Sequence, residues 1–292
     1  MIHPKNKEKY FTWFIIISVF LILSFIVHFI LYDDILDEWI PRKNLQKDGF
    51  CILKNILSKK EIEMLKSECE NDDYKQAKER LINNKKLVSR LKTQLGEKYE
   101  FQDYVFIIKK SAIHTCHRDS NGDFFNEGQK YPSYTMLIFL EKMDKCLGVI
   151  PESHKDVNSF NINMSDKVVN LLCNPGDAIL FNANLIHVGA LNNTDDNLRI
   201  QMKVTHKDDI DKIPYYNDYN KVLNEDNNLP FYLRKAQRKL SCLFPIVSNW
   251  TQTEIKRTSG GSDSGVEISP IQKVFSYLFY GNGNFYDLPN AF

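Results

Sequence analysis

The sequence predicts a mainly β domain, a sandwich or barrel with flanking helices, preceded by one transmembrane helix. Three observations predict this: an uncharged apolar run near the N-terminus, a capped helix after it, and short apolar runs separated by turn signals from residue 101 onward. Several short strands joined by turns are typical of β-sandwiches and barrels. The chain has 292 residues, of which 43% are hydrophobic and 26% charged. This is enough for one large domain with attachments.

The N-terminal apolar run, residues 11–32, contains no charged side chain. A helix of that length would extend about 33 Å, and the hydrocarbon core of a membrane is about 30 Å thick. A signal peptide is the alternative, but its apolar core is about 7–15 residues long and ends in small residues, which this run lacks. We therefore expect a single-pass anchor that follows a tail at residues 1–10.

The charges around this run indicate its orientation. Lysines precede it at positions 5, 7 and 9, and basic residues close to a span favour the cytoplasmic side. We therefore expect a cytoplasmic N-terminus and a catalytic domain that is lumenal or extracytoplasmic. Other lysines and arginines near the far end weaken this preference.

The folded part is expected to begin at about residue 44, with a short strand near Phe50 and then a helix. Ser58 and Glu61 have the spacing of a capping box, which predicts a helix over residues 59–70. Residues 72–98 are rich in charges and are expected to be helical in part.

The β-rich segment is expected to run from residue 101 to about 207. Its apolar runs are YVFIIKKSAIH, YTMLIFLEKM, CLGVIP, KVVNLLC, DAILFNANLIHVG and LRIQMKVTH, and NPGD at 174–177 predicts a tight turn before one of them. Beyond residue 207 the strand pattern stops. The extension, 208–292, contains a basic amphipathic segment, LPFYLRKAQRKLSCLF, and a flexible linker at 259–265.

Charge and cysteine content exclude some classes of protein. A formal net charge of +1 gives no general electrostatic reason to expect nucleic acid as a partner. The six cysteines are scattered without a CxxC pair, which matches neither a zinc site nor a dense disulfide framework.

The stretch HTCHRD, residues 114–119, places two histidines and an aspartate within six positions. Side chains of an extended strand alternate between its two faces, so His117 and Asp119 share one face while His114 lies on the other. A polar strand end that leads into a loop would have the same composition. One imidazole and one carboxylate need a second imidazole to form the two-histidine, one-carboxylate triad of non-haem Fe(II) oxygenases. The pair therefore indicates part of a metal site.

The third ligand would come from a histidine outside the membrane segment, which leaves His154, His187 and His206. His187 ends an apolar strand and is followed by Gly189, where a ligand could approach the backbone closely. On the residues alone, the other two histidines stay open as alternatives.

Arg199 lies twelve residues beyond His187 and opens a strand with one apolar and one polar face. The polar face also carries Gln201, Lys203 and Thr205. An arginine that points into a barrel is suited to binding a carboxylate, because its planar fork can donate two parallel hydrogen bonds.

Four stretches together resemble the phytanoyl-CoA dioxygenase family of Fe(II)/2-oxoglutarate oxygenases. They are DGFCILKNILSKKEIEML, HTCHRD, GVIPESHK and PGDAILFNANLIHVGALNNTDDNLR, and the resemblance covers residues 44–207. It implies a double-stranded β-helix, a jelly-roll or cupin-like barrel with supporting helices. It further implies iron ligands His117, Asp119 and His187, with Arg199 holding 2-oxoglutarate, and O2 as the other co-substrate. The chain departs from the family pattern at Glu152, where glycine is usual.

The resemblance, together with the apolar run at 11–32, leads us to expect a membrane-anchored dioxygenase that hydroxylates a C–H bond and releases succinate and CO2. Halogenating relatives lack the carboxylate ligand, so Asp119 favours hydroxylation. We expect a small-molecule substrate, with a lipid or acyl compound among the candidates. Two alternatives remain: a metal-dependent hydrolase on a cupin-like barrel, which would not need Arg199, and a membrane-tethered non-catalytic metal-binding or scaffold module.

Overall fold

The computed structural model describes residues 4–31, 44–110, 116–119, 121–123, 126–143, 145–155, 168–189, 196–224 and 229–243, with short pieces between 256 and 278. Its helices are α1 (Pro4–Leu31), α2 (Leu45–Asp48), α3 (Lys59–Glu70), α4 (Tyr74–Ile82), α5 (Lys85–Leu95) and α6 (Phe231–Leu243). The predicted linker at 259–265 and His114 lie outside the described residues.

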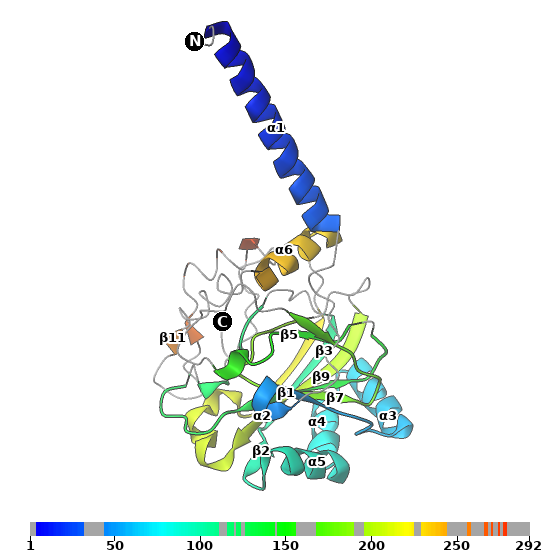
Figure 1. Ribbon diagram of the computed structural model, residues 1–292. Helices are drawn as coiled ribbons and strands as arrows, with labels where there is room; N and C mark the ends of the chain where they lie inside the picture. Colours follow the sequence, from blue (N-terminus) through cyan, green and yellow to red (C-terminus); the bar gives the residue numbers. More distant parts are fainter. Residues whose placement is uncertain are drawn as a thin grey trace.

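The strands confirm a mainly β fold with flanking helices (Figure 1). They are β1 (Phe50–Leu53), β2 (Tyr99–Phe101), β3 (Tyr104–Lys110), β4 (Tyr134–Phe139), β5 (Leu147–Val149), β6 (Val169–Leu171), β7 (Ala178–Asn182), β8 (His187–Gly189), β9 (Asp196–His206), β10 (Tyr219–Asn224), β11 (Lys256–Arg257) and β12 (Val266–Glu267). The larger sheet has the order β1-β7-β4-β9-β3-β10, with β2 also paired to β9. A smaller sheet has the order β6-β5-β8, and β11 pairs with β12.

Apolar side chains fill the space between the larger and the smaller sheet. This cluster combines residues of β1, β4 and β7 with residues of β5 and β6, among them Phe50, Leu137, Phe139, Leu147, Val149, Val169, Leu171, Ile179 and Phe181. Side chains from two sheets meet in one core only when the sheets face each other. The two sheets therefore face each other across a shared core, which is consistent with the predicted jelly-roll barrel.

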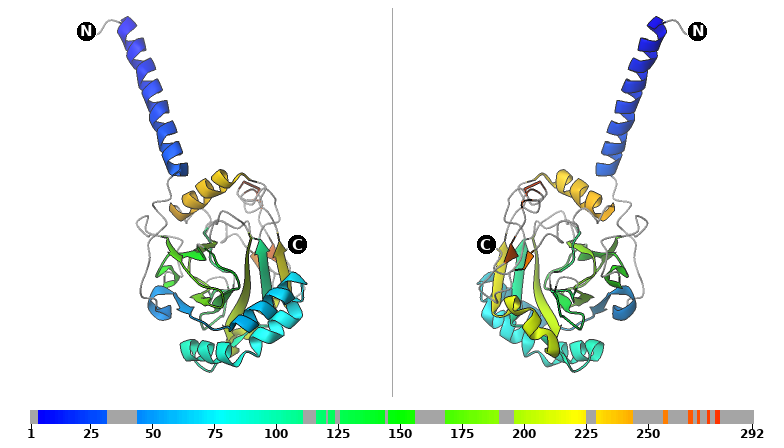
Figure 2. Two further views of the ribbon diagram at one scale, coloured as in Figure 1. Left: turned by 90° about the vertical axis from the view of Figure 1, so that its right-hand side faces the viewer. Right: turned by 90° about the vertical axis from the view of Figure 1, so that its left-hand side faces the viewer.

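Helices α3, α4 and α5 cover the opposite face of the larger sheet (Figure 2). Their buried leucines pack against the alternate residues of β3, β4, β7 and β9. The predicted helix at 59–70 is confirmed with its capping box, in which the Ser58 side chain accepts from the Glu61 amide and the Glu61 carboxylate accepts from the Ser58 amide. The capping interactions satisfy amide groups that a helix start leaves unpaired.

The NPGD turn sets the start of β7. Gly176 adopts φ +85°, and a Cβ there would lie 3.0 Å from the Leu57 carbonyl oxygen, so the position favours glycine. The carboxylate of Asp177 accepts from the amides of Asn55 and Asn174, and from Lys54 Nζ at 2.8 Å. The turn is thus fixed from three sides, and β7 leads directly to the segment that contains His187.

Two elements beyond residue 207 join the barrel. β10 pairs in parallel with β3, which corrects the expectation that strands end near residue 207. The predicted amphipathic helix is confirmed as α6. Its Arg238 donates from Nε to the Gly189 carbonyl at 3.1 Å and from Nη2 to Asn170 Oδ1 at 3.1 Å. Its Ser241 hydroxyl accepts from the Cys116 amide at 3.2 Å.

The N-terminal apolar run lies in α1, which projects from the body and meets it at α6 (Figures 1 and 2). The large apolar side chains described in residues 11–27 are exposed. Judged by length and apolarity, no helix in the described part of the chain qualifies as a membrane span. The predicted anchor is thus helical from residue 11 to Leu31, and its insertion into a membrane stays a prediction.

Candidate metal centre

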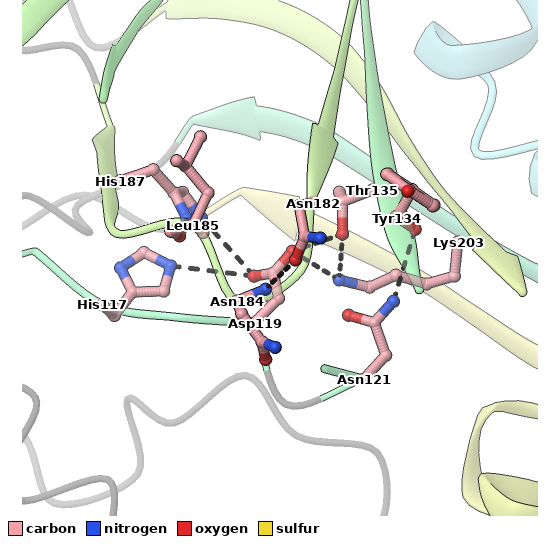
Figure 3. Close-up of polar contacts among 10 residues, drawn as sticks. All are labelled: His117, Asp119, Asn121, Tyr134, Thr135, Asn182, Asn184, Leu185, His187 and Lys203. Atoms are coloured by element: carbon pink, nitrogen blue, oxygen red, sulfur yellow. Dashed lines mark hydrogen bonds and ion pairs between the residues drawn. The ribbon is translucent and has the colours of Figure 1, made fainter. Parts of the chain in front are cut away.

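Backbone hydrogen bonds bring the two histidine-bearing segments side by side. His117 and His187 form an antiparallel bridge, in which each amide donates to the other's carbonyl at 2.9 Å. The Asp119 amide donates to the Ala183 carbonyl at 2.8 Å, so the H-x-D pair is bound to the segment that runs from Ala183 to His187, the first residue of β8. The predicted alternation is confirmed, since His117 and Asp119 face the same site (Figure 3).

The three predicted ligands lie together as a possible metal site. One ligand atom from each of His117, Asp119 and His187 lies within 4.8 Å of the others. Asp119 Oδ1 is 3.5 Å from His187 Nε2 and 4.0 Å from His117 Nε2. Asp119 and His187 are almost fully buried, whereas His117 keeps about a quarter of its side chain exposed, 27%. The site is therefore reached from the His117 side.

Neighbouring groups hold this geometry. His187 Nδ1 is 2.9 Å from the Leu185 carbonyl, which orients the ring so that Nε2 points to Asp119. Such a contact fixes the ring of a metal-binding histidine. Arg118, which is fully buried between the two ligands of the H-x-D pair, donates from Nη1 to the Asn184 carbonyl at 2.7 Å. Phe181 packs on the His187 ring, with a centroid distance of 4.6 Å.

Lys203 and Thr135 contact the second carboxylate oxygen of Asp119. Lys203 Nζ donates to Oδ2 at 2.8 Å and to the Thr135 hydroxyl at 3.0 Å, and that hydroxyl in turn donates to Oδ2 (Figure 3). Burial alone would raise the pKa of Asp119. The Lys203 ammonium, with smaller contributions from His187 and His117, instead holds this pKa well below its usual range. Asp119 is therefore an ionised carboxylate, the form that binds a metal ion.

Arg199 lies on the interior face of β9, the face that also carries Lys203. The alternate residues of this strand belong to the core on the opposite side of the sheet, namely Leu198, Ile200, Met202 and Val204. This confirms the predicted division into a polar and an apolar face. Arg199 is buried, and burial lowers its pKa to about 10. The guanidinium therefore remains charged at neutral pH inside the barrel.

The donor set fits Fe(II). Two imidazole nitrogens and one carboxylate oxygen on one side of a site are the protein ligands of non-haem iron oxygenases. The alternative histidines make other contacts: His154 Nε2 is 3.2 Å from the Gln46 carbonyl, and His206 stacks on Tyr131 with ring centroids 3.7 Å apart. Neither belongs to the group of three potential ligands found in the described residues.

The sequence did not predict that Lys203 and Thr135 contact Asp119 in this site. Lys203 stands on the polar face of its strand, so its interior position was visible, but nothing in the sequence pairs it with a residue 84 positions away. Thr135 lies within the apolar run YTMLIFLEKM and gives no signal of its own.

Glu152 replaces the usual glycine in a left-handed conformation, with φ +67°. Only glycine adopts this region without steric cost, which explains why a glycine is expected there. The turn is kept by a hydrogen bond from the Glu152 amide to the Asp48 carbonyl at 3.0 Å, and by an ion pair with Lys155 at 2.6 Å. The substitution thus strains the backbone but does not touch the metal ligands.

Several solved structures match part of this structure at low sequence identity. The 2-oxoglutarate-dependent epimerase SnoN from nogalamycin biosynthesis is 15% identical, with a TM-score of 0.48 over 56% of this chain and 78% of its own. HygX from Streptomyces hygroscopicus, solved with nickel and 2-oxoglutarate, is 16% identical, with a TM-score of 0.43 over 56% and 84%. EvdO2 from Micromonospora carbonacea var. aurantiaca, complexed with 2-oxoglutarate, is 14% identical, with a TM-score of 0.44 over 58% and 91%.

The sequence itself matches one known family. No curated protein shows significant similarity to the chain. The sequence model of the family Phytanoyl-CoA dioxygenase (PhyH) matches residues 100–200. That segment contains the three clustered ligands and Arg199. The predicted resemblance is therefore confirmed over residues 100–200, and this segment is similar to the Fe(II)/2-oxoglutarate-dependent enzymes of the phytanoyl-CoA dioxygenase family.

Proposed function

We propose that the protein hydroxylates a C–H bond of a small-molecule substrate, with a lipid or acyl compound as the favoured class. The observation that carries the oxygenase part is the combination of a two-histidine, one-carboxylate group with a buried arginine on the same interior surface. Asp119 supports hydroxylation rather than halogenation, because a halide would need the position that this carboxylate fills.

Each residue of the site has a distinct part in this reaction. His117, Asp119 and His187 would hold the metal from one side and leave the other side open for 2-oxoglutarate and O2. When bound, these groups supply the oxidant that removes hydrogen from the substrate, and 2-oxoglutarate leaves as succinate and CO2. Arg199 would pair with the distal carboxylate of 2-oxoglutarate. The apolar barrel lining, including Phe181 beside His187, keeps water away from the reacting atoms.

The test is reconstitution of purified protein with Fe(II) and 2-oxoglutarate without oxygen. We expect the charge-transfer absorption of an iron-bound 2-oxo acid. Admission of O2 together with fractionated lipids or metabolites should then give succinate, with Asp119→Ala as the inactive control. Binding of Fe(II) without this absorption or succinate would favour the hydrolase or the non-catalytic metal-binding module. Binding of neither iron nor 2-oxoglutarate would favour the scaffold alternative.

We further propose that α1 attaches the enzyme to a membrane, with the N-terminus cytoplasmic and the catalytic domain lumenal or extracytoplasmic. The proposal is supported by the uncharged run at 11–32 and by the exposed apolar side chains along α1. We expect the domain to be protected from protease in sealed membranes and to be digested once detergent is added. A variant without residues 1–32 should be released into the soluble fraction. Digestion of the domain in intact vesicles would contradict the orientation.

A further inference from the structure

The two carboxylate oxygens of Asp119 lie in different surroundings. Oδ1 faces the ring nitrogens of His187 and His117, at 3.5 and 4.0 Å. Oδ2 points the other way and accepts hydrogen bonds from Lys203 and Thr135. One oxygen is thus directed to the metal position and the other is bound to the barrel wall.

The groups that bind Oδ2 are held firmly. Thr135 and Lys203 are direct partners in the register of β4 and β9, in the middle of the larger sheet. Lys203 is 2% exposed, and its Nζ lies 5.8 Å from the ring centre of Tyr104 and 5.7 Å from that of Tyr216. An ammonium over aromatic faces gains cation–π attraction, and a buried lysine has few other rotamers to adopt. The position of Nζ is therefore set by the sheet, whether or not a metal is bound.

We propose that Lys203 and Thr135 are positioning residues that restrict Asp119 to one metal-facing oxygen. A free carboxylate can bind a metal through one oxygen or through both. Binding through both would occupy a second position, one of those that a chelating 2-oxo acid and O2 require. Because Lys203 and Thr135 retain Oδ2, these positions stay open. This inference rests on the proposed function for the identity of the co-substrate, but not for the effect on metal binding.

The charge of Lys203 acts in opposite directions on the two ligands. Its ammonium repels a divalent cation bound at Oδ1 and attracts a doubly negative 2-oxo acid. Loss of Lys203 should therefore strengthen metal binding, both by removing this repulsion and by freeing Oδ2 to coordinate. The same loss should weaken 2-oxoglutarate binding. Loss of a residue that only supports the fold would instead weaken the binding of both the metal and 2-oxoglutarate.

The experiment compares Lys203→Met and Thr135→Val with wild type, using Ni(II) as an oxygen-stable probe. Calorimetric titration should show a Ni(II) affinity higher than that of wild type, by up to about tenfold, in Lys203→Met. Titration of the Ni(II)-loaded proteins with 2-oxoglutarate should show about a tenfold or greater loss of affinity. Thr135→Val should change both affinities in the same directions but less, and Thr135→Ser, which keeps the hydroxyl, should resemble wild type.

The matched control is Lys221→Met, which removes another lysine that lies over an aromatic ring, 5.7 Å from the Phe106 ring centre, without touching Asp119. It should leave both affinities unchanged. Without metal, Lys203→Met should melt at a lower temperature than wild type, because buried Asp119 loses its cationic partner. Addition of Ni(II) should then raise the melting temperature of Lys203→Met by more than it raises that of wild type.

A fall in Ni(II) affinity in both Lys203→Met and Thr135→Val, or no change in either affinity, would overturn the inference. If wild type binds Ni(II) but no 2-oxo acid, the proposed function fails. In that case the direction of the Ni(II) change in Lys203→Met still decides the positioning role.

Discussion

We expect His187→Ala to abolish Fe(II) binding, and with it the turnover of 2-oxoglutarate. The substitution removes one of the three potential ligands that cluster in the described part of the chain, at a buried position where water cannot easily be held in the same geometry. Loss of a group that merely orients a ligand costs about 10- to 100-fold in metal affinity, so loss of the ligand itself should cost more than about a hundredfold. Anaerobic calorimetric titration with Fe(II) measures the effect directly.

The matched control is His154→Ala, because His154 contacts the Gln46 carbonyl and stands outside the ligand group. His114→Ala should also retain most of the iron, since the alternation expected from the sequence places His114 on the opposite face from Asp119. His117→Ala should behave as His187→Ala does. If His114→Ala removed the iron and His117→Ala kept it, the assignment of the ligands would be wrong.

Arg199→Ala should keep the iron and lose 2-oxoglutarate. A dicarboxylate that chelates iron through its keto-acid end places its distal carboxylate in the poorly solvated barrel, where it needs a cation. To leave that carboxylate buried and unpaired should cost about 3–5 kcal/mol, a factor of hundreds or more in affinity. Arg199→Lys should recover only part of the affinity, because an ammonium supplies charge without the planar fork. The affinity for 2-oxoglutarate can be measured in wild type, Arg199→Ala and Arg199→Lys by titration of the iron–keto-acid absorption without oxygen.

Arg90→Ala provides the comparison, since Arg90 is an exposed arginine on α5 far from the interior face of β9. It should bind 2-oxoglutarate as wild type does. An unchanged affinity for 2-oxoglutarate in Arg199→Ala would mean that another cationic side chain binds the distal carboxylate. Lys203 is already engaged by Asp119, so Lys110 at the end of β3 would be examined first.

Local rules predicted the parts of this protein that depend on near neighbours. The capping box at Ser58 and the shared face of His117 and Asp119 follow from spacings of three and two residues, and both are confirmed. The β10 strand was missed because its residues, YNKVLN, are only partly buried and do not alternate between apolar and polar. Its pairing with β3 is set by the sheet edge rather than by its own composition.

The contacts of Lys203 show where local rules end. Its polar strand face predicted an interior position, yet its partner is an aspartate that comes from a different segment. Only the register of β4 against β9, with the bridge between His117 and His187, brings the two groups together. Such contacts form only in the complete barrel, so the spacing of residues along the sequence does not predict them.

The hydrogen bonds of α6 have a consequence for any shortened form of the enzyme. A chain that stopped at residue 207 would keep every predicted site residue and the whole family match. It would lose the side chain of Arg238, which joins β8, the strand that begins with His187, to β6 across the intervening β5. It would also lose the Ser241 hydroxyl, which accepts from the amide next to His117. Both histidine-bearing segments are thus braced by one helix from outside the matched region. Truncation and domain-exchange studies should therefore treat residues 44–243 as the indivisible piece.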